Sequence, residues 1–295
     1  MITFLVCSIR EASARDLAAN LAATCGVEFE LLVHDNRETH WGLARVYNHL
    51  ADRARFPLLC FIHEDVRFLS PPAWGPELVR FYAANARAGV VGFAGSQVKS
   101  RIASGWVNLS RYSRENFVQH IGGGRTRAKR NNPKGEAFSQ VSVVDGLCLF
   151  APREVWRAHR FDEATFAGFH LYDLDFCTQV ASTHANHVCH TVLAEHFSLG
   201  SFGEDWCDAT DAYHRKWAGR LPLACLPLSA AALERCEAYS AYRYLRDRLK
   251  SPVVSEARLV LAWQAYRAHA TLLRDLKLLR PRLVAARRRR RTPAS

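Results

Sequence analysis

The chain has 295 residues and a formal net charge of +12, with 49% hydrophobic and 23% charged residues. This balance excludes a disordered chain and predicts a folded core. Residues 251–295 contain eleven Lys or Arg and two acidic residues, so this segment carries +9 of the net charge. The basic character therefore belongs to the C-terminus. No recognised RNA- or DNA-binding motif accompanies it, so we expect no nucleic-acid partner.

The nine cysteines indicate a reducing compartment. Their number is odd, they form no C-x-x-C pair, and most lie inside apolar runs such as FLVCS and LLCFI. The apolar run at residues 2–7 is too short for a signal peptide. No apolar run approaches the ~20 residues that span a bilayer. We therefore expect a cytoplasmic protein with free, buried thiols.

Short apolar runs alternate with amphipathic segments in the first hundred residues. The expected strands are 2–7, 29–35, 57–62 and 89–95, and the expected helices are 11–24, 43–55 and 74–88. Strands joined by helices of this length imply right-handed βαβ crossovers. The prediction is an α/β domain, residues 1–225, with a mostly parallel central sheet flanked by helices.

The pattern breaks between residues 97 and 140, which predicts a long irregular insertion. It contains the glycines 122–124 and a basic run at 125–130. A mobile lid with the glycines as a hinge fits this composition, and so does a solvated loop.

Regular patterns return after residue 140. The expected elements are strands at 141–150 and 187–194 and helices at 152–158 and 171–183. From about residue 225 the chain is expected to be helical, giving an extension over residues 226–295.

Two features mark this helical extension. An apolar stripe at helical spacing predicts packing against the main domain or a partner helix, and it comprises Leu259, Trp263, Tyr266, Ala270, Leu273 and Leu276. A polybasic end follows, with Arg280, Arg282 and residues 287–291. Such an end favours contact with an anionic membrane surface.

Polar residues follow three of the predicted strands, where open parallel sheets bind their ligands. These groups are Ser8 with Arg10, His34-Asp35-Asn36, and His63-Glu64-Asp65. The last group combines an imidazole with two carboxylates, which are ligands suited to Mg²⁺ or Mn²⁺. Solvated turns are the alternative interpretation.

Two further carboxylates, Asp173 and Asp175, lie in a helix expected to start near Tyr172. Residues two apart on a helix diverge, so these carboxylates cannot face one ligand. One acting as a general base while the other braces the loop fits this geometry. Helix capping is the alternative role for either residue.

Histidines and a cysteine gather between residues 184 and 196. His187 and Cys189 share one face of the predicted strand, whereas His190 lies on the other, and zinc-finger spacing is absent. We therefore do not expect structural zinc. His196 ends a strand, where its imidazole can reach a metal held by another strand end.

In this order the motifs resemble the family-2-like glycosyltransferases of GT-A fold. More narrowly, they resemble the glycosyltransferase-like group that includes a streptomycin-biosynthesis (StrF-type) domain. The resemblance covers roughly residues 2–217 and rests on GLARVYN, FIHEDV, GVVGFAGS, VVDGLCLF, FDEATFAGFHLYDLDFC, EHFSLGS and RKW. It implies a GT-A-like fold and a hexosyltransferase-like activity that uses a nucleotide sugar.

The resemblance also implies residue roles. Asp173 matches the catalytic base of inverting members, and Tyr172 stands where glutamate is usual. Asp65 and His196 match metal-site positions for Mn²⁺ or Mg²⁺, and His63 replaces the first Asp of the D-x-D motif. The implied substrate-binding residues are Ser8, Arg10, Asp35 and Asn48 around the nucleotide, Asp145 and Gly146 on the acceptor side, and Asp175.

The implied reaction moves a sugar from a nucleotide-diphosphate donor to an acceptor hydroxyl with inversion, in bacterial surface-polysaccharide or secondary-metabolite glycosylation. The acceptor is a carbohydrate, a lipid-linked molecule or a small molecule. Lipid-linked acceptors would suit peripheral contact of the Arg-rich tail with the inner face of the membrane. His63 and Tyr172 depart from the common motifs, which leaves a catalytically silent sugar-binding module of the same fold as the alternative.

Overall fold

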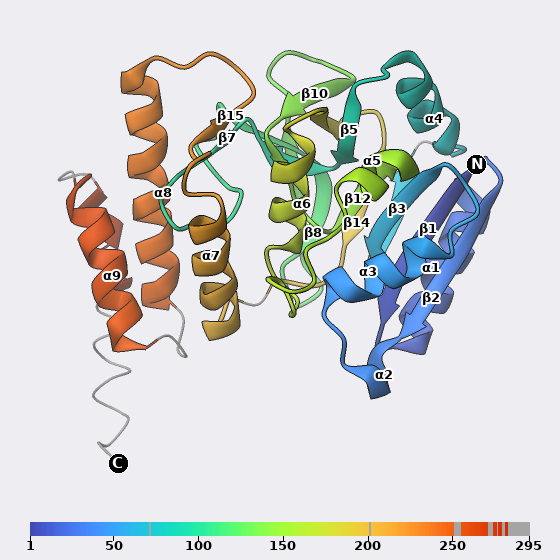
Figure 1. The fold of residues 1–295 in the computed structure, drawn as a ribbon, viewed down its shortest axis with the longest axis horizontal. Coiled ribbons are helices and arrows are strands. Elements are labelled where there is room, and N and C mark those ends of the chain that lie inside the picture. Colours follow the sequence, from blue (N-terminus) through green and yellow to red (C-terminus); the bar gives the residue numbers. More distant parts are fainter. Residues whose placement is uncertain are drawn as a thin grey trace.

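The computed structural model describes residues 1–70, 72–200, 202–250, 255–270, 274–275, 277–278 and 281–282. A seven-stranded sheet with the order β10-β13-β5-β12-β3-β1-β2 forms its centre (Figure 1). The bounds are β1 Ile2–Ser8, β2 Phe29–Asp35, β3 Leu58–His63, β5 Ala88–Gly92, β10 Phe138–Val141, β12 Cys148–Pro152 and β13 Ala185–Cys189. β1 pairs in parallel with β2 and β3, and β13 pairs in parallel with β5. The mostly parallel sheet is confirmed, with β12 and β10 antiparallel to their neighbours.

Helices pack on both faces of this sheet. They are α3 Leu43–Asp52, α5 Arg153–Ala158 and α6 Tyr172–Val180 on one face, and α1 Glu11–Thr24 and α4 Gly75–Ala84 on the other. Along β3, Leu59 and Phe61 join the first core, whereas Cys60 and Ile62 join the second. This alternation follows from the two-residue period of a strand. The predicted α/β class, a mostly parallel sheet flanked by helices, is confirmed by this architecture.

A second sheet has the order β11-β6-β8-β14-β4, and β9 pairs with β8. Its strands are β4 Val66–Ser70, β6 Ala94–Ser96, β8 Ser113–His120, β9 Thr126–Asn131, β11 Val143–Val144 and β14 Leu193–His196. The irregular insertion expected at 97–140 is therefore wrong, because much of it forms the β8–β9 hairpin.

β8 lacks the apolar pattern of a buried strand in the sequence, because some of its buried side chains are polar. Arg114 and Asn116 are 2% and 8% exposed. Arg114 donates to Gln97 Oε1 at 2.8 Å, and Asn116 donates to the Val192 carbonyl at 2.7 Å. Gly122–Gly124 have positive φ angles in the hairpin turn. Closure of this hairpin as a lid stays a prediction.

The single strand expected at 141–150 is divided among β10, β11 and β12. The reason is that β11 pairs with β6 of the second sheet, whereas β12 pairs with β3 of the first. Asp145 and Gly146 lie where the chain passes between the two sheets. The strand expected at 187–194 is likewise divided into β13 and β14.

The C-terminal part is helical, as predicted, with α8 Ala230–Lys250 and α9 Glu256–Arg267. The preceding helix α7, Glu204–Lys216, has no counterpart among the predicted elements. On α8, the buried Glu237 accepts hydrogen bonds from the backbone N–H groups of Arg101 and Ile102 at 3.1 and 3.2 Å. Strands β7 Val98–Lys99 and β15 Leu223–Ala224 form a small third sheet. The domain boundary at residue 225 stays a prediction.

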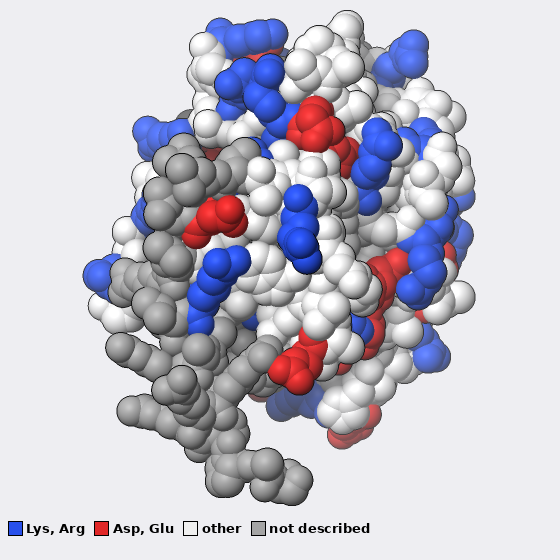
Figure 2. Space-filling view, turned by 90° about the vertical axis from the view of Figure 1, so that its left-hand side faces the viewer, with Lys and Arg blue, Asp and Glu red and all other residues white. Residues whose placement is uncertain are grey.

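Of the stripe predicted on the last helix, Leu259 and Tyr266 are buried, Trp263 is partly buried and Ala270 is exposed. Leu259 and Tyr266 pack with residues of α8. Leu273, Leu276, Arg280 and residues 287–291 lie outside the described residues, whereas the Arg282 guanidinium lies 4.1 Å from the Trp263 ring centre. Figure 2 shows the side of the molecule on which α8 and α9 lie in Figure 1. Lys and Arg side chains are dispersed there among neutral and acidic ones. Within the described part of the chain, no helix is long and apolar enough to cross a membrane.

Candidate active site

A cleft of about 450 Å³ opens beyond the carboxyl ends of β1, β2 and β3. It is lined by Cys7, Ile9, Arg10, Asn36, His40–Leu43, His63–Asp65, Ala167–Phe169 and Ser198. This is the edge of a parallel sheet at which ligands bind. Five separate parts of the chain therefore share one cavity.

His63, Asp65 and His196 form a cluster able to hold a metal. Their ligand atoms lie within 4.8 Å of one another. The sequence places His63 at the end of β3 and Asp65 in the turn that follows, but His196 comes from β14. Antiparallel pairing aligns His196 with Val66 of β4 and brings its Nε2 to 3.6 Å from Asp65 Oδ1. Imidazole and carboxylate groups are both ligands of divalent metal ions.

His63 is neutral near pH 7, because burial and then the nearby His196 lower its pKa to about 4. Its Nε2 lies 3.0 Å from the Tyr172 hydroxyl. His196 Nδ1 lies 3.2 Å from Gln119 Oε1. Gln119 belongs to β8, so a strand absent from the sequence-based prediction supports the cluster. Neutral imidazoles are the form in which histidine binds a metal.

Asp173 lies in the first turn of α6, with Oδ2 accepting a hydrogen bond from Gly146 N–H at 2.8 Å. Burial raises the pKa of Asp173 to about 7, and the charge of Asp145 adds to the shift. A Cβ atom at Gly146 would lie 2.5 Å from the Tyr172 hydroxyl oxygen, so only glycine fits there. A carboxylate with a pKa near neutrality is suited to general-base catalysis.

Glu64 organises the loop after β1, a role that was not predicted for it. This carboxylate accepts hydrogen bonds from Ser8 Oγ at 2.6 Å, from Arg10 Nε at 2.9 Å, and from the backbone N–H groups of Ile9 and Arg10. Ser8 is buried, whereas the Arg10 side chain is 59% exposed and lines the cleft. Arg10 is thus held where an anionic ligand can meet its guanidinium.

Two predicted substrate-binding residues lie in the core instead. Asn48 is 3% exposed; its amide donates to the Phe161 carbonyl at 2.9 Å and accepts from Trp156 Nε1 at 3.1 Å. Asp175 is fully buried and lies 2.7 Å from Lys216 Nζ. Their polar atoms hold helices and loops together, and neither side chain lines the cleft.

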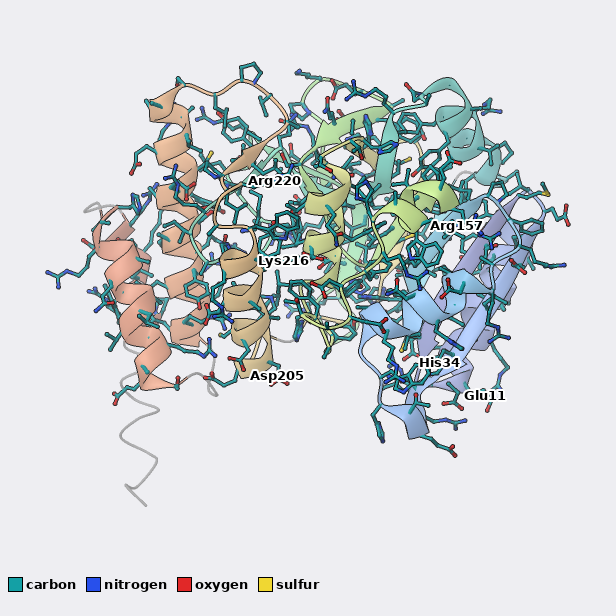
Figure 3. The ribbon with its side chains drawn as sticks, in the orientation of Figure 1. Glu11, His34, Arg157, Asp205, Lys216 and Arg220 are labelled. Carbon is teal, nitrogen blue, oxygen red and sulfur yellow. The ribbon has the colours of Figure 1, made fainter. Side chains whose placement is uncertain are left out.

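Asp175 also accepts a hydrogen bond from Trp217 Nε1 at 2.8 Å. Lys216 reaches from the end of α7 toward α6, where Asp175 lies (Figure 3). The two carboxylates of α6 diverge, as expected from their spacing, and Asp175 is the one that braces its surroundings.

Asp35 and Asp145 lie near the cleft without lining it. Asp35 is exposed at the end of β2 and forms an ion pair with Arg37. Asp145 Oδ2 accepts a hydrogen bond from Trp106 Nε1 at 2.5 Å, and Oδ1 accepts one from Leu147 N–H at 3.0 Å. Trp106 lies in the segment expected to be irregular, and no sequence signal marked it as a neighbour of the site.

Comparison with known protein families gives the class of this protein, a glycosyltransferase. A family model described as "Glycosyltransferase like family" matches residues 3–217, which is more than half of the chain. The chain belongs to this family, and its general activity is glycosyl transfer.

Sequence comparison with curated proteins gives no match. Many solved structures resemble the chain, and two of them serve as examples. The crystal structure of A197 from STIV has a TM-score of 0.38 and 14% identity, covering 67% of this chain and 86% of that one. The crystal structure of GalNAc-T7 with UDP, GalNAc and Mn²⁺ has a TM-score of 0.47 and 8% identity, covering 91% of this chain and 54% of that one.

Proposed function

We propose that this protein transfers a sugar from a nucleotide-diphosphate donor to an acceptor hydroxyl in one inverting displacement. The observation that carries the proposal is the pairing of two features at one site. Asp173 is a carboxylate with a pKa raised to about 7, and the metal-capable cluster of His63, Asp65 and His196 lies nearby. Tyr172 links the two features, since it contacts His63 and precedes Asp173.

Asp173 is the proposed general base. Its carboxylate takes the proton of the acceptor hydroxyl while the acceptor oxygen bonds to the anomeric carbon. The bond from that carbon to the diphosphate oxygen breaks, and its electron pair leaves with the nucleotide diphosphate. The Gly146 N–H fixes the orientation of the carboxylate during this transfer.

His63, Asp65 and His196 are the residues that would hold a divalent cation, Mn²⁺ or Mg²⁺. Bound there, such a cation supplies positive charge that stabilises the departing diphosphate. Arg10 adds a second positive charge at the cleft, oriented by Glu64. Both contributions favour a donor that leaves as an anion over a neutral one.

Nucleotide release tests the proposal directly. Purified protein is incubated with a panel of nucleotide sugars and simple sugar acceptors, with Mn²⁺, with Mg²⁺ and with EDTA. We expect release with Mn²⁺ and a ~10²–10⁴-fold loss in Asp173→Asn, the usual contribution of a general base. Glu163→Gln, an exposed acid ten residues earlier, is the matched control and should stay active.

Two results would contradict parts of this proposal. Donor binding by calorimetry without any release would make the protein a catalytically silent binding module. A product that retains the anomeric configuration of the donor would rule out a single inverting displacement.

We further propose a cytoplasmic location, with the Arg-rich tail contacting the inner face of the membrane when the acceptor is lipid-linked. All nine cysteines are free, which supports a reducing compartment. Deleting residues 281–295 should abolish binding to anionic liposomes in a sedimentation assay. Unchanged liposome binding would show that the tail does not mediate membrane contact.

A further inference from the structure

The two positions that depart from the common family motifs contact each other. His63 ends β3 and Tyr172 begins α6, 109 residues later, yet His63 Nε2 lies 3.0 Å from the Tyr172 hydroxyl. The hydroxyl also donates to the Gly146 carbonyl at 3.2 Å. The two residues that differ from the common motifs, His63 and Tyr172, are thus hydrogen-bond partners of each other.

The Gly146 carbonyl decides the direction of these hydrogen bonds. A carbonyl oxygen only accepts, so the single hydroxyl proton of Tyr172 is directed to Gly146. The Tyr172 oxygen then accepts from His63, which requires the proton of the neutral imidazole to be on Nε2. The lone pair of His63 is therefore on Nδ1.

We propose that Tyr172 is a positioning residue that holds His63 with its Nδ1 lone pair available to the divalent cation shared with Asp65 and His196. This inference rests on the proposed function and deepens it. Metal-binding histidines commonly donate their second ring N–H to a fixed acceptor, which orients the ring and selects the tautomer. The phenol oxygen is that acceptor here.

The surroundings of Tyr172 suit this role. Its side chain is 3% exposed, and its ring packs against Tyr47 and Phe161 with centroids 5.7 and 5.9 Å apart. The absence of a side chain at Gly146 leaves room for the hydroxyl. The phenol is therefore confined, and it adds no negative charge to a ligand set that contains one carboxylate.

Metal binding without any donor tests the inference. The affinity of the full-length protein for Mn²⁺ is measured by the electron paramagnetic resonance signal of free Mn²⁺. Tyr172→Phe removes only the hydroxyl, and we expect a ~10–100-fold weaker affinity, as for other outer partners of metal ligands. Tyr213→Phe is the matched control, because it deletes another buried tyrosine hydroxyl, bonded to Thr178, and should bind Mn²⁺ like the wild type.

Nitrogen-15 NMR of the histidine side chains in the metal-free wild type gives a second test that needs no variant. The Nε2–H tautomer of His63 is expected, and an Nδ1–H tautomer would overturn the inference. Wild-type affinity in a folded Tyr172→Phe protein would overturn it as well. Failure of the proposed metal site would give a different result. The wild type itself would then bind no Mn²⁺, and His63→Ala would not change the Mn²⁺ affinity.

Discussion

Gly146 N–H donates a hydrogen bond of 2.8 Å to Asp173 Oδ2, joining the chain crossing between the two sheets to the first turn of α6. This bond favours the ionised carboxylate, whereas burial and the charge of Asp145 oppose it. Burial and the charge of Asp145 have the larger effect, so the pKa of Asp173 is raised to about 7. The carboxylate is fixed in place and still able to exchange a proton near neutral pH.

The first prediction concerns the pH dependence of transfer. A general base works only when it is deprotonated, so kcat should rise with pH and level off above the Asp173 pKa of about 7. Below that value it should fall about tenfold per pH unit. The measurement is kcat against pH at saturating donor and Mn²⁺. A flat profile between pH 5 and pH 8 would remove Asp173 from the role.

The second prediction concerns the stability of Asp173→Asn. Folding raises the pKa of this acid above its ordinary value of 3.8, so the folded state binds the proton more tightly than the unfolded state. Ionised Asp173 therefore destabilises the fold increasingly as pH rises from about 4 to 7. Asp173→Asn should be more stable than the wild type at pH 8, with a smaller gain at pH 5, in urea unfolding. Equal stability at pH 8 would contradict the raised pKa.

The third prediction separates Asp175 from substrate binding. Lys216→Met leaves the buried Asp175 without its cation, and Lys216 also contacts Asp162. Breaking a buried ion pair from one side costs about 3–5 kcal/mol. We expect a loss of that order in the free energy of unfolding, largely restored when Asp175→Asn is added. The kcat per folded molecule should not change, and a donor KM raised by the double variant would return Asp175 to the binding site.

The fourth prediction concerns Glu64. Glu64→Gln removes the charge that holds Arg10 Nε and weakens the bonds to the loop after β1. A charge-assisted hydrogen bond contributes about 1.5–3 kcal/mol, which corresponds to a donor KM raised about tenfold or more. Little change is expected in kcat. The exposed Glu28→Gln is the control, and a Glu64→Gln enzyme with wild-type KM would show that the loop orders without this carboxylate.

Much of the fold could be predicted because its signals are local. The apolar runs of β1, β2 and β3 and the periodicity of α1 and α3 appear in consecutive residues. In contrast, β8 was missed because buried partners satisfy Arg114 and Asn116, so that the strand looks polar. The run at 141–150 looked like one strand because its two halves are equally apolar, although they pair in different sheets.

By itself the sequence determined that His63 and Asp65 lie together at the end of a strand and in the turn after it, and that Asp173 and Asp175 diverge from one helix turn. These relations depend on local geometry. The tertiary structure alone decided which side chains meet. The β14–β4 pairing brings His196 to Asp65, and the packing of α6 against β3 and the Asp145–Gly146 crossing brings Tyr172 to His63. Tertiary packing also buries Asn48 and Asp175 in the core, where the Phe161 carbonyl and Lys216 satisfy their polar atoms. Strand register and core packing set these partners, and both depend on residues far apart in the chain.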